Sequence, residues 1–236
     1  MGNMCASAEG AIRKAGGGEM LDKAKDRISD GVEIPYGQEK EIPDLATKGV
    51  GQARVGIKYV SKEGKRVDAE FAAIEFSKDG AKIDHATYNH TETADGGCKH
   101  LGDSTGSAGA EFIALKIGSI AEEVQAIIMC CYIFNMSDEI NMSSFDDIKL
   151  VLKAAPGDGD DNLAPICHMK ITPKDDATHT GITLMALYRA EEGKWKAKNV
   201  YSEGAGPSND DMIPACTKLF AELGIASDAP PPAEGE

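Results

Sequence analysis

ARVGIKYV, residues 53–60, alternates apolar side chains with polar or small ones. A period of two is typical of a β-strand that has one face in a core and the other in solvent. The segments from Phe112 to Ile117 and from Ile148 to Lys153 follow the same pattern. These three segments predict strands of a sheet that is buried on one side.

Short apolar segments continue in both directions from this one, separated by Gly, Pro and Asp. Nine segments qualify as strands: GVEIP, ARVGIKYV, EFAAIEF, FIALKI, VQAIIMCCYIF, IKLVLKA, ICHMKI, GITLMALYR and KWKAKNVY. Many short strands with turn-rich connections and almost no helix between them favour antiparallel sheets packed face to face. We therefore expect an all-β fold, a two-sheet antiparallel β-sandwich.

A short amphipathic helix is predicted close to the C-terminal end of the sequence. Asp210 or Asp211 can cap its first turn, and Gly224 can end it. Its apolar stripe consists of Cys216, Leu219, Phe220 and Leu223. The 236 residues are enough for one sizeable core, so we expect one domain over residues 31–225. Residues 1–30 are expected to form an N-terminal segment with a spacer helix, and residues 226–236 a disordered tail.

Composition narrows the class of partner. The formal net charge is −14 and the pI is about 4.8. Nucleic acid requires clustered Lys and Arg, so we expect no nucleic-acid partner, and cations or basic partners fit better. Six cysteines without a CxxC pair or an apolar signal segment indicate reduced thiols in a cytosolic compartment. No window of the sequence approaches the ~20 consecutive apolar residues of a membrane span.

The first seven residues, MGNMCAS, suggest lipid attachment. Gly2 behind the initiator Met resembles an N-myristoylation signal, and Cys5 is placed for palmitoylation. Ala6 occupies the usual Ser or Thr position, with Ser7 one place later, so the match is incomplete. One myristoyl chain binds membranes only marginally, and acidic residues balance the basic ones nearby, so the second signal would have to be Cys5. We expect a cytoplasmic protein at the cytosolic face of a membrane; the alternative is an unmodified N-terminal segment.

Potential cation ligands gather in YNHTETADGGCKHLGDSTG, residues 88–106. Ca²⁺ takes six to eight oxygen ligands, and glycine lets backbone carbonyls turn inward. Asn89, Glu92, Asp95 and Asp103 can supply side-chain oxygens. An ordinary polar hairpin loop is the alternative, because Asp-Gly is itself a strong turn signal.

Five motifs in one order resemble the TerD domain family of calcium-binding proteins, which is associated with tellurite resistance and stress response. They are GVEIPYGQEKEI, ARVGIKYV with VDAEFAA, the segment 88–106, MSSFDDIKLVLKA, and LYRAEEGKWKAKNVYSEGAG, and they span about Gly31 to Gly206. Five such motifs in the same order are hard to obtain by chance. The resemblance implies a two-sheet β-sandwich with calcium sites gathered at one end.

The resemblance also implies six metal ligands, with Ca²⁺ as the cofactor. They are Asp68, Glu70, Asn89, Asp95, Asp103 and Glu111. Asp68 and Glu70 stand where the family has its paired Asp residues. Asp95 stands at the family's Asp-Gly turn, and Asp103 at its Gly-Asp-Asn motif. Asn89 holds one of two tandem Asn positions, and His90 replaces the other.

The sequence departs from the family pattern at three of these places. The run of three acids after the glycines is reduced to Ala110 and Glu111, and Ser104 replaces a second Asn. Glu70 reaches one methylene further than the Asp that it replaces. Because Ca²⁺ affinity follows ligand charge and site rigidity, one of the family's sites could be weakened or lost, and we expect one retained site.

Two other groups of side chains fit known sites less well. The acidic segment from Asp158 to Asn162 lacks the Gly at position six and the Glu at position twelve of an EF-hand loop, so a solvated turn is the better account. Cys98 and His100 could share a strand face as a nucleophile and its base. Nothing in the sequence supplies an orienting third group or an oxyanion pocket, so we do not expect an enzyme.

Two functions of different classes remain open. In the first, the protein is a membrane-tethered calcium-binding module that presents metal-ordered loops to a protein partner, in stress response. In the second, it is a metal-independent structural adaptor recruited to a membrane or a large assembly by its acylated N-terminal segment. The reduced acid run favours the second function, and Asp68, Asp95 and Asp103 favour the first.

Overall fold

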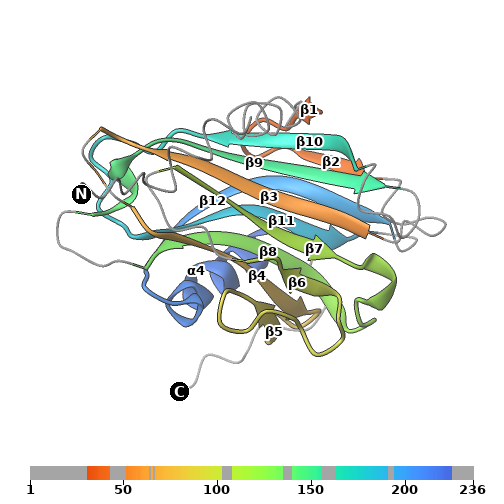
Figure 1. Cartoon of the computed structure of the whole chain (residues 1–236). Coiled ribbons are helices and arrows are strands. Elements are labelled where there is room, and N and C mark those ends of the chain that lie inside the picture. Colours follow the sequence, from red (N-terminus) through yellow and green to blue (C-terminus); the bar gives the residue numbers. More distant parts are fainter. Residues whose placement is uncertain are drawn as a thin grey trace, which may run out of the picture.

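The structure is a computed structural model that describes residues 31–42, 52–63, 65, 67–102, 108–134, 140–155, 163–190 and 194–224. The described residues form twelve strands in two six-stranded sheets, and the helix α4 lies against one of them (Figure 1). The predicted two-sheet β-sandwich with a short C-terminal helix is therefore confirmed. The segments predicted for residues 1–30 and 226–236 lie outside the described residues.

Sheet A has the strand order β1-β10-β9-β3-β7-β6. These strands are β1 (Val32–Glu33), β10 (Ala164–Ile171), β9 (Phe145–Ala155), β3 (Gln52–Ser61), β7 (Ala108–Leu115) and β6 (Cys98–His100). All neighbours are antiparallel except β1 and β10. The alternation predicted for residues 53–60 is confirmed, because Ala53, Val55, Ile57 and Tyr59 lie in the core between the sheets. The strand predicted from Phe112 stops at Leu115, and Ile117 begins a 3₁₀ turn, η1 (Ile117–Ser119).

Sheet B has the strand order β2-β12-β11-β8-β4-β5, and all its neighbouring strands are antiparallel. These strands are β2 (Glu39–Ile42), β12 (Trp195–Gly204), β11 (Gly181–Arg189), β8 (Val124–Ile133), β4 (Ala69–Ser77) and β5 (Lys82–Ala86). The central strands β4, β8 and β11 are buried along almost their whole length. Burial on both faces explains why their sequences are continuous apolar runs rather than alternations.

Three strands were not predicted, namely β2, β5 and β6. Each of them is an edge strand of its sheet. Their sequences, EKEI, KIDHA and CKH, are short and largely polar. An edge strand contacts only one neighbouring strand and needs few apolar side chains, so its hydrophobic pattern is weak.

The helix α4 (Asn209–Glu222) covers the outer face of sheet B, on the side away from sheet A (Figure 1). The predicted cap was wrong: Ser208, rather than Asp210 or Asp211, is the N-cap. The Ser208 hydroxyl accepts from the Asp211 N–H, and the Asp211 carboxylate accepts from the Ser208 N–H at 3.1 Å, which is a capping box. Met212 sits over Gly181, where an added Cβ would lie 2.2 Å from its sulfur, so a bare backbone is needed there.

Phe220 supplies the main apolar contact between α4 and sheet B. Its ring is stacked on Phe76 of β4, with centroids 5.7 Å apart. The remaining 3₁₀ turn, η2 (Met142–Ser144), leads into β9. Among the described residues, no helix is long and apolar enough to cross a membrane.

A buried carboxylate interrupts the core at the end of β4. Glu75 is 1% exposed and lies on the inner face of its strand, in step with Phe71 and Ala73. Burial, together with the negative charge of Asp95, raises the pKa of Glu75 to about 7. The Cys98 thiol opposes this rise by hydrogen bonding, but Oε1 of Glu75 is buried without a hydrogen-bond partner. This position is therefore costly whenever Glu75 is ionised.

We expect Phe220→Ala to lower the free energy of unfolding by about 3–5 kcal/mol, because a buried ring is lost and the contact with Phe76 with it. Urea denaturation measures this change. Lys218→Ala, an exposed change on the same helix, is the control and should shift stability by less than about 0.5 kcal/mol. Equal effects of the two changes would contradict the packing of α4 on sheet B.

Glu75→Gln should change how stability depends on pH. The folded chain holds the Glu75 proton more tightly than the unfolded chain, so its contribution falls as pH rises from the ordinary pKa of 4.5 to about 7. The Gln variant should match the wild type near pH 4.5 and exceed it at pH 8 by up to roughly 3 kcal/mol. Urea denaturation at both pH values measures the difference, and parallel pH profiles for the two proteins would refute the assignment.

Candidate metal site

The structure places the predicted metal ligands in different parts of the sandwich. Asp68 immediately precedes β4, Glu70 lies in β4, and Glu111 lies in β7. Asn89 and Asp95 belong to the connection between β5 and β6. The sixth predicted ligand, Asp103, and the predicted lipidation residues Gly2 and Cys5 lie outside the described residues.

Glu111 joins the two sheets. Its side chain is fully buried on the inner face of β7, and Oε2 accepts a hydrogen bond from the Phe71 N–H of β4 at 2.9 Å. The same oxygen lies 3.3 Å from Nε2 of His100 in β6. Gly102 N–H donates to Nδ1 of His100, so in this arrangement Nε2 carries the proton and donates to Glu111. The carboxylate of Glu111 thus accepts from both sheets at once.

Asp68 and Glu70 stand at the start of β4, close in sequence to Phe71, whose N–H donates to Glu111. Glu70 alternates with Phe71 and is in step with Ala72 and Ile74, so it lies on the face of sheet B that α4 covers, whereas Glu111 lies between the sheets. Burial raises the pKa of Tyr59, and the charges of Glu111 and Asp68 contribute to the shift. Burial also raises the pKa of Cys131, and the charges of Glu111 and Glu70 add to the shift. Glu70 itself is only 2% exposed. Three of the six predicted ligands therefore belong to the end of the sandwich where β4 begins, but Glu70 and Glu111 lie on opposite faces of sheet B.

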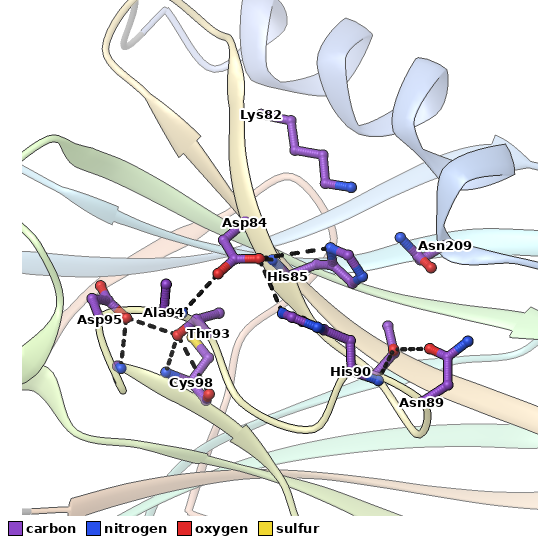
Figure 2. Close-up of polar contacts among 12 residues, drawn as sticks. Lys82, Asp84, His85, Asn89, His90, Thr93, Ala94, Asp95, Cys98 and Asn209 are labelled. Carbon is purple, nitrogen blue, oxygen red and sulfur yellow. Dashed lines mark hydrogen bonds and ion pairs between the residues drawn. The ribbon is translucent and has the colours of Figure 1, made fainter.

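Asp95 lies toward the other end of β4. Its Oδ1 accepts from the Gly97 N–H and the Thr93 hydroxyl, each at 2.7 Å, and its Oδ2 accepts from the Ala121 N–H at 2.8 Å. Figure 2 shows the contacts that Asp95 makes within its own loop. Asp95 raises the pKa of Glu75, which lies four residues along β4 from Phe71, the residue that donates to Glu111. Four residues of extended strand span roughly 13 Å. In this structure Asp95 fastens the β5–β6 connection to the β7–β8 connection.

Asn89 is exposed and does not join the other predicted ligands. Its Oδ1 accepts from the Thr87 hydroxyl at 2.7 Å. The neighbouring His90 pairs with Asp84, whose Oδ1 lies 3.3 Å from Nε2 (Figure 2). Burial acts to raise the pKa of Asp84, but the Ala94 and His85 N–H groups outweigh it and lower this pKa.

Asp84 organises this loop although it was not predicted as a functional residue. Its Oδ2 accepts from the Ala94 N–H at 2.7 Å, and its Oδ1 accepts from the N–H of its neighbour His85 at 2.8 Å. The signal that could have found it is the segment KIDHA, which places an acid between Ile83 and His85, six residues before His90. Asp84 and Asp95 together hold the β5–β6 connection by its backbone.

The thiol of Cys98 is poorly suited to act as a nucleophile. Cys98 is fully buried, and burial raises its pKa well above the ordinary value, with the charge of Glu75 adding to the shift. Reactive thiols need a lowered pKa and access to solvent. The imidazole of His100 is also engaged with Glu111. These positions argue against a Cys98–His100 dyad.

The carboxylate oxygens at the end of the sandwich where β4 begins are of the type that binds hard cations. The described residues do not, however, complete a coordination sphere. Asp68, Glu70 and Glu111 offer carboxylate oxygens, the ligand type that Ca²⁺ prefers. Within the described ranges, no three His, Cys, Asp or Glu side chains are close enough together to hold one metal ion. A calcium site here would draw its remaining ligands from backbone carbonyls, water or residues such as Asp103.

Two solved structures resemble this one. SAV2460, a protein of unknown function, superposes with a TM-score of 0.53 and 12% identity, over 77% of this chain and 100% of that chain. SCO6318 from Streptomyces coelicolor A3(2), a homologue of the telluride resistance protein TerD, gives a TM-score of 0.52 and 14% identity, over 76% of this chain and 100% of that chain. Such low identities establish the shared fold alone. A comparison with curated proteins gives no match.

The sequence itself carries the family assignment. The TerD domain matches residues 31–207, which begin just before β1 and end just before α4. This span includes both sheets and the carboxylates of Asp68, Glu70 and Glu111. The chain therefore belongs to the TerD domain family.

Proposed function

We propose that this protein is a calcium-binding TerD module, attached to the cytosolic face of a membrane by its N-terminal segment. It would present metal-ordered loops to a protein partner. The observation that carries the proposal is that Asp68, Glu70 and Glu111 all belong to the end of the sandwich where β4 begins. A homologue of a telluride resistance protein shares the fold, and a role of this chain in such stress is part of the proposal.

The electrostatics of this end favour a cation. Glu70 and Glu111 are 2% and 0% exposed, and burying an ionised carboxylate costs free energy that hydrogen bonds only partly offset. A bound Ca²⁺ would supply two positive charges and accept oxygen ligands from several segments. Glu111 would hold it while still accepting from the Phe71 N–H, and Asp68 would reach it from the start of β4. Metal binding would then stiffen the chain segments at this end.

The attachment to a membrane rests on sequence. Gly2 and Cys5 together would carry two acyl chains, and two lipid signals are needed for stable anchoring. The protein partner is proposed only as a class, since a stiffened loop set at one end of a sandwich is a surface that a partner can recognise.

A metal-independent adaptor is the second candidate, and the hydrogen bonds of Asp95 favour it. Both oxygens of Asp95 accept from N–H or O–H groups of the protein, which is the role of a structural residue rather than a free ligand. Asn89 likewise accepts from Thr87. In this case the same sandwich would bind partners without Ca²⁺.

Thermal unfolding with and without Ca²⁺ separates the two candidates. At 100 times the dissociation constant a ligand of the folded state adds about 2.7 kcal/mol, which should raise Tm by roughly 5–10 °C in a domain of this size. Glu111→Gln should abolish the rise, because Gln can still accept from Phe71 but carries no charge. Glu75→Gln is the matched control, a buried carboxylate distant from the proposed site, and should keep the calcium-dependent rise. No rise in the wild-type protein would favour the adaptor.

Gly2→Ala should move the protein from the membrane fraction to the soluble fraction of a eukaryotic cell, because it removes the acceptor of the myristoyl chain. Cys5→Ser should give an intermediate distribution, since one chain alone binds marginally. Sedimentation followed by immunoblotting measures both. Ser7→Ala is the control, and unchanged fractionation of the Gly2 variant would refute the acyl anchor.

A further inference from the structure

We propose that Cys130 and Cys216 form a redox-active dithiol, which a hydroperoxide converts into a disulfide that locks α4 onto sheet B. Cys130 lies in β8 and Cys216 in α4, so the two thiols belong to segments that are far apart in the sequence. Both side chains are fully buried where the helix meets the sheet. This modification site goes beyond the calcium and acyl sites proposed above and does not depend on them.

The alternation along β8 decides where Cys130 points. Cys130 packs in the outer cluster under α4, together with Ile128 and Tyr132, which lie two residues away on either side. Its neighbour Cys131 packs instead in the core between the two sheets. Because β8 is flanked by β11 and β4, Cys130 lies in the interior of sheet B rather than at an edge.

The apolar stripe of α4 brings Cys216 over the same strand. Met212 and Phe220 lie four residues before and after Cys216, and residues four apart share one face of a helix. Met212 lies against Gly181 of β11, and Phe220 stacks on Phe76 of β4. Since β8 lies between β11 and β4, the helix residue midway between these contacts reaches β8. Figure 1 shows α4 on this side of the sandwich.

The two thiols are in contact. Cys130 is hydrogen-bonded to Cys216 through its side chain, and this bond, together with burial, raises the pKa of Cys130 well above its ordinary value. Disulfide formation starts from such a contact and brings the two sulfurs to about 2.05 Å. The other described cysteines, Cys98, Cys131 and Cys167, all pack in the core between the sheets and do not face α4.

Packing alone does not explain why two cysteines meet here. Buried cysteine often serves as a small apolar side chain. The described contact between α4 and sheet B uses alanine for that purpose, at Ala72, Ala126, Ala186 and Ala215. In the same cluster cysteine occurs on both elements, and the two cysteines face each other across the interface. A role in thiol chemistry accounts for this pairing.

The docked helix keeps the dithiol unreactive, so the reaction requires α4 to open. Thiolates react with peroxides, whereas buried thiols are inert. Local opening of a peripheral element costs less free energy than global unfolding, and α4 packs on the sandwich through one face. When α4 opens, the sulfur of Cys130 meets solvent and its pKa returns toward the ordinary value. The opening of α4 therefore controls access of the oxidant.

The reaction consumes one hydroperoxide for each pair of thiols. The Cys216 thiolate, which the helix carries into solvent, attacks the O–O bond and becomes a sulfenic acid, and the departing alkoxide takes up a proton to leave as an alcohol. As α4 docks again, the Cys130 thiol attacks this sulfur, forms the S–S bond and releases water. The two sulfurs together lose two electrons, and the peroxide oxygens gain them.

The test treats the full-length chain carrying Cys5→Ser with hydrogen peroxide, in EDTA and under native conditions. Alkylation followed by intact-mass measurement counts the remaining thiols, and peptide mapping identifies the linked pair. We expect the loss of two thiols to one Cys130–Cys216 disulfide within a single chain, reversed by dithiothreitol. The oxidised protein should have a Tm higher by roughly 10 °C, because the crosslink joins segments far apart in the sequence.

Substitutions separate this pair from the other thiols. Cys130→Ala and Cys216→Ala should each abolish the disulfide and the rise in Tm. Cys131→Ala is the matched control, because this neighbour of Cys130 faces the other way, and it should keep both. Phe220→Ala should speed disulfide formation by roughly tenfold or more, since loss of the stacked ring lets α4 open more often. Circular dichroism shows whether each variant is folded.

Four results would overturn the proposal. They are retention of all thiols in both the parent and the Phe220→Ala protein, a disulfide between other cysteines, oxidation of single cysteines to sulfinic or sulfonic acid without a disulfide, and a disulfide that leaves Tm unchanged. The measurements involve neither Ca²⁺ nor the Cys5 acyl chain. Their outcome is therefore distinct from the outcome of the calcium and acylation experiments.

Discussion

The packing of α4 against sheet B is the constraint on which the rest of the structure depends. Because α4 covers the outer face of sheet B and sheet A covers its inner face, β4, β8 and β11 must be apolar on both sides. Charged groups in these strands are then tolerated only toward the strand ends, where Glu70 and Glu75 are found. Sheet A, in contrast, has an outer face that α4 leaves uncovered. The position of one helix therefore decides where charged groups are tolerated in sheet B and which sheet has an outer face that α4 does not cover.

Much of the fold could be predicted because burial leaves a clear periodic signal. The alternation in residues 53–60 arises from one-sided burial in sheet A, and the run VQAIIMCCYIF arises from two-sided burial in sheet B. The edge strands β2, β5 and β6 were missed because their pairing depends on backbone hydrogen bonds with one neighbour. The N-cap was predicted two or three residues too late because Ser and Asp are both favourable N-cap residues. The residue types alone therefore do not distinguish Ser208 from Asp210 or Asp211.

The candidate site could be predicted only in part. Asp68 and Glu70 are two residues apart in sequence, and Glu111 reaches the same part of β4, at Phe71, because β7 and β4 approach each other there. Asp95 was grouped with them because it shares a segment with other polar residues. In the structure Tyr88 packs on Phe134 while Asp95 accepts from the Ala121 N–H, so these two residues serve opposite ends of the sandwich. Sequence proximity within a loop carries no information about which end of a sheet each residue reaches.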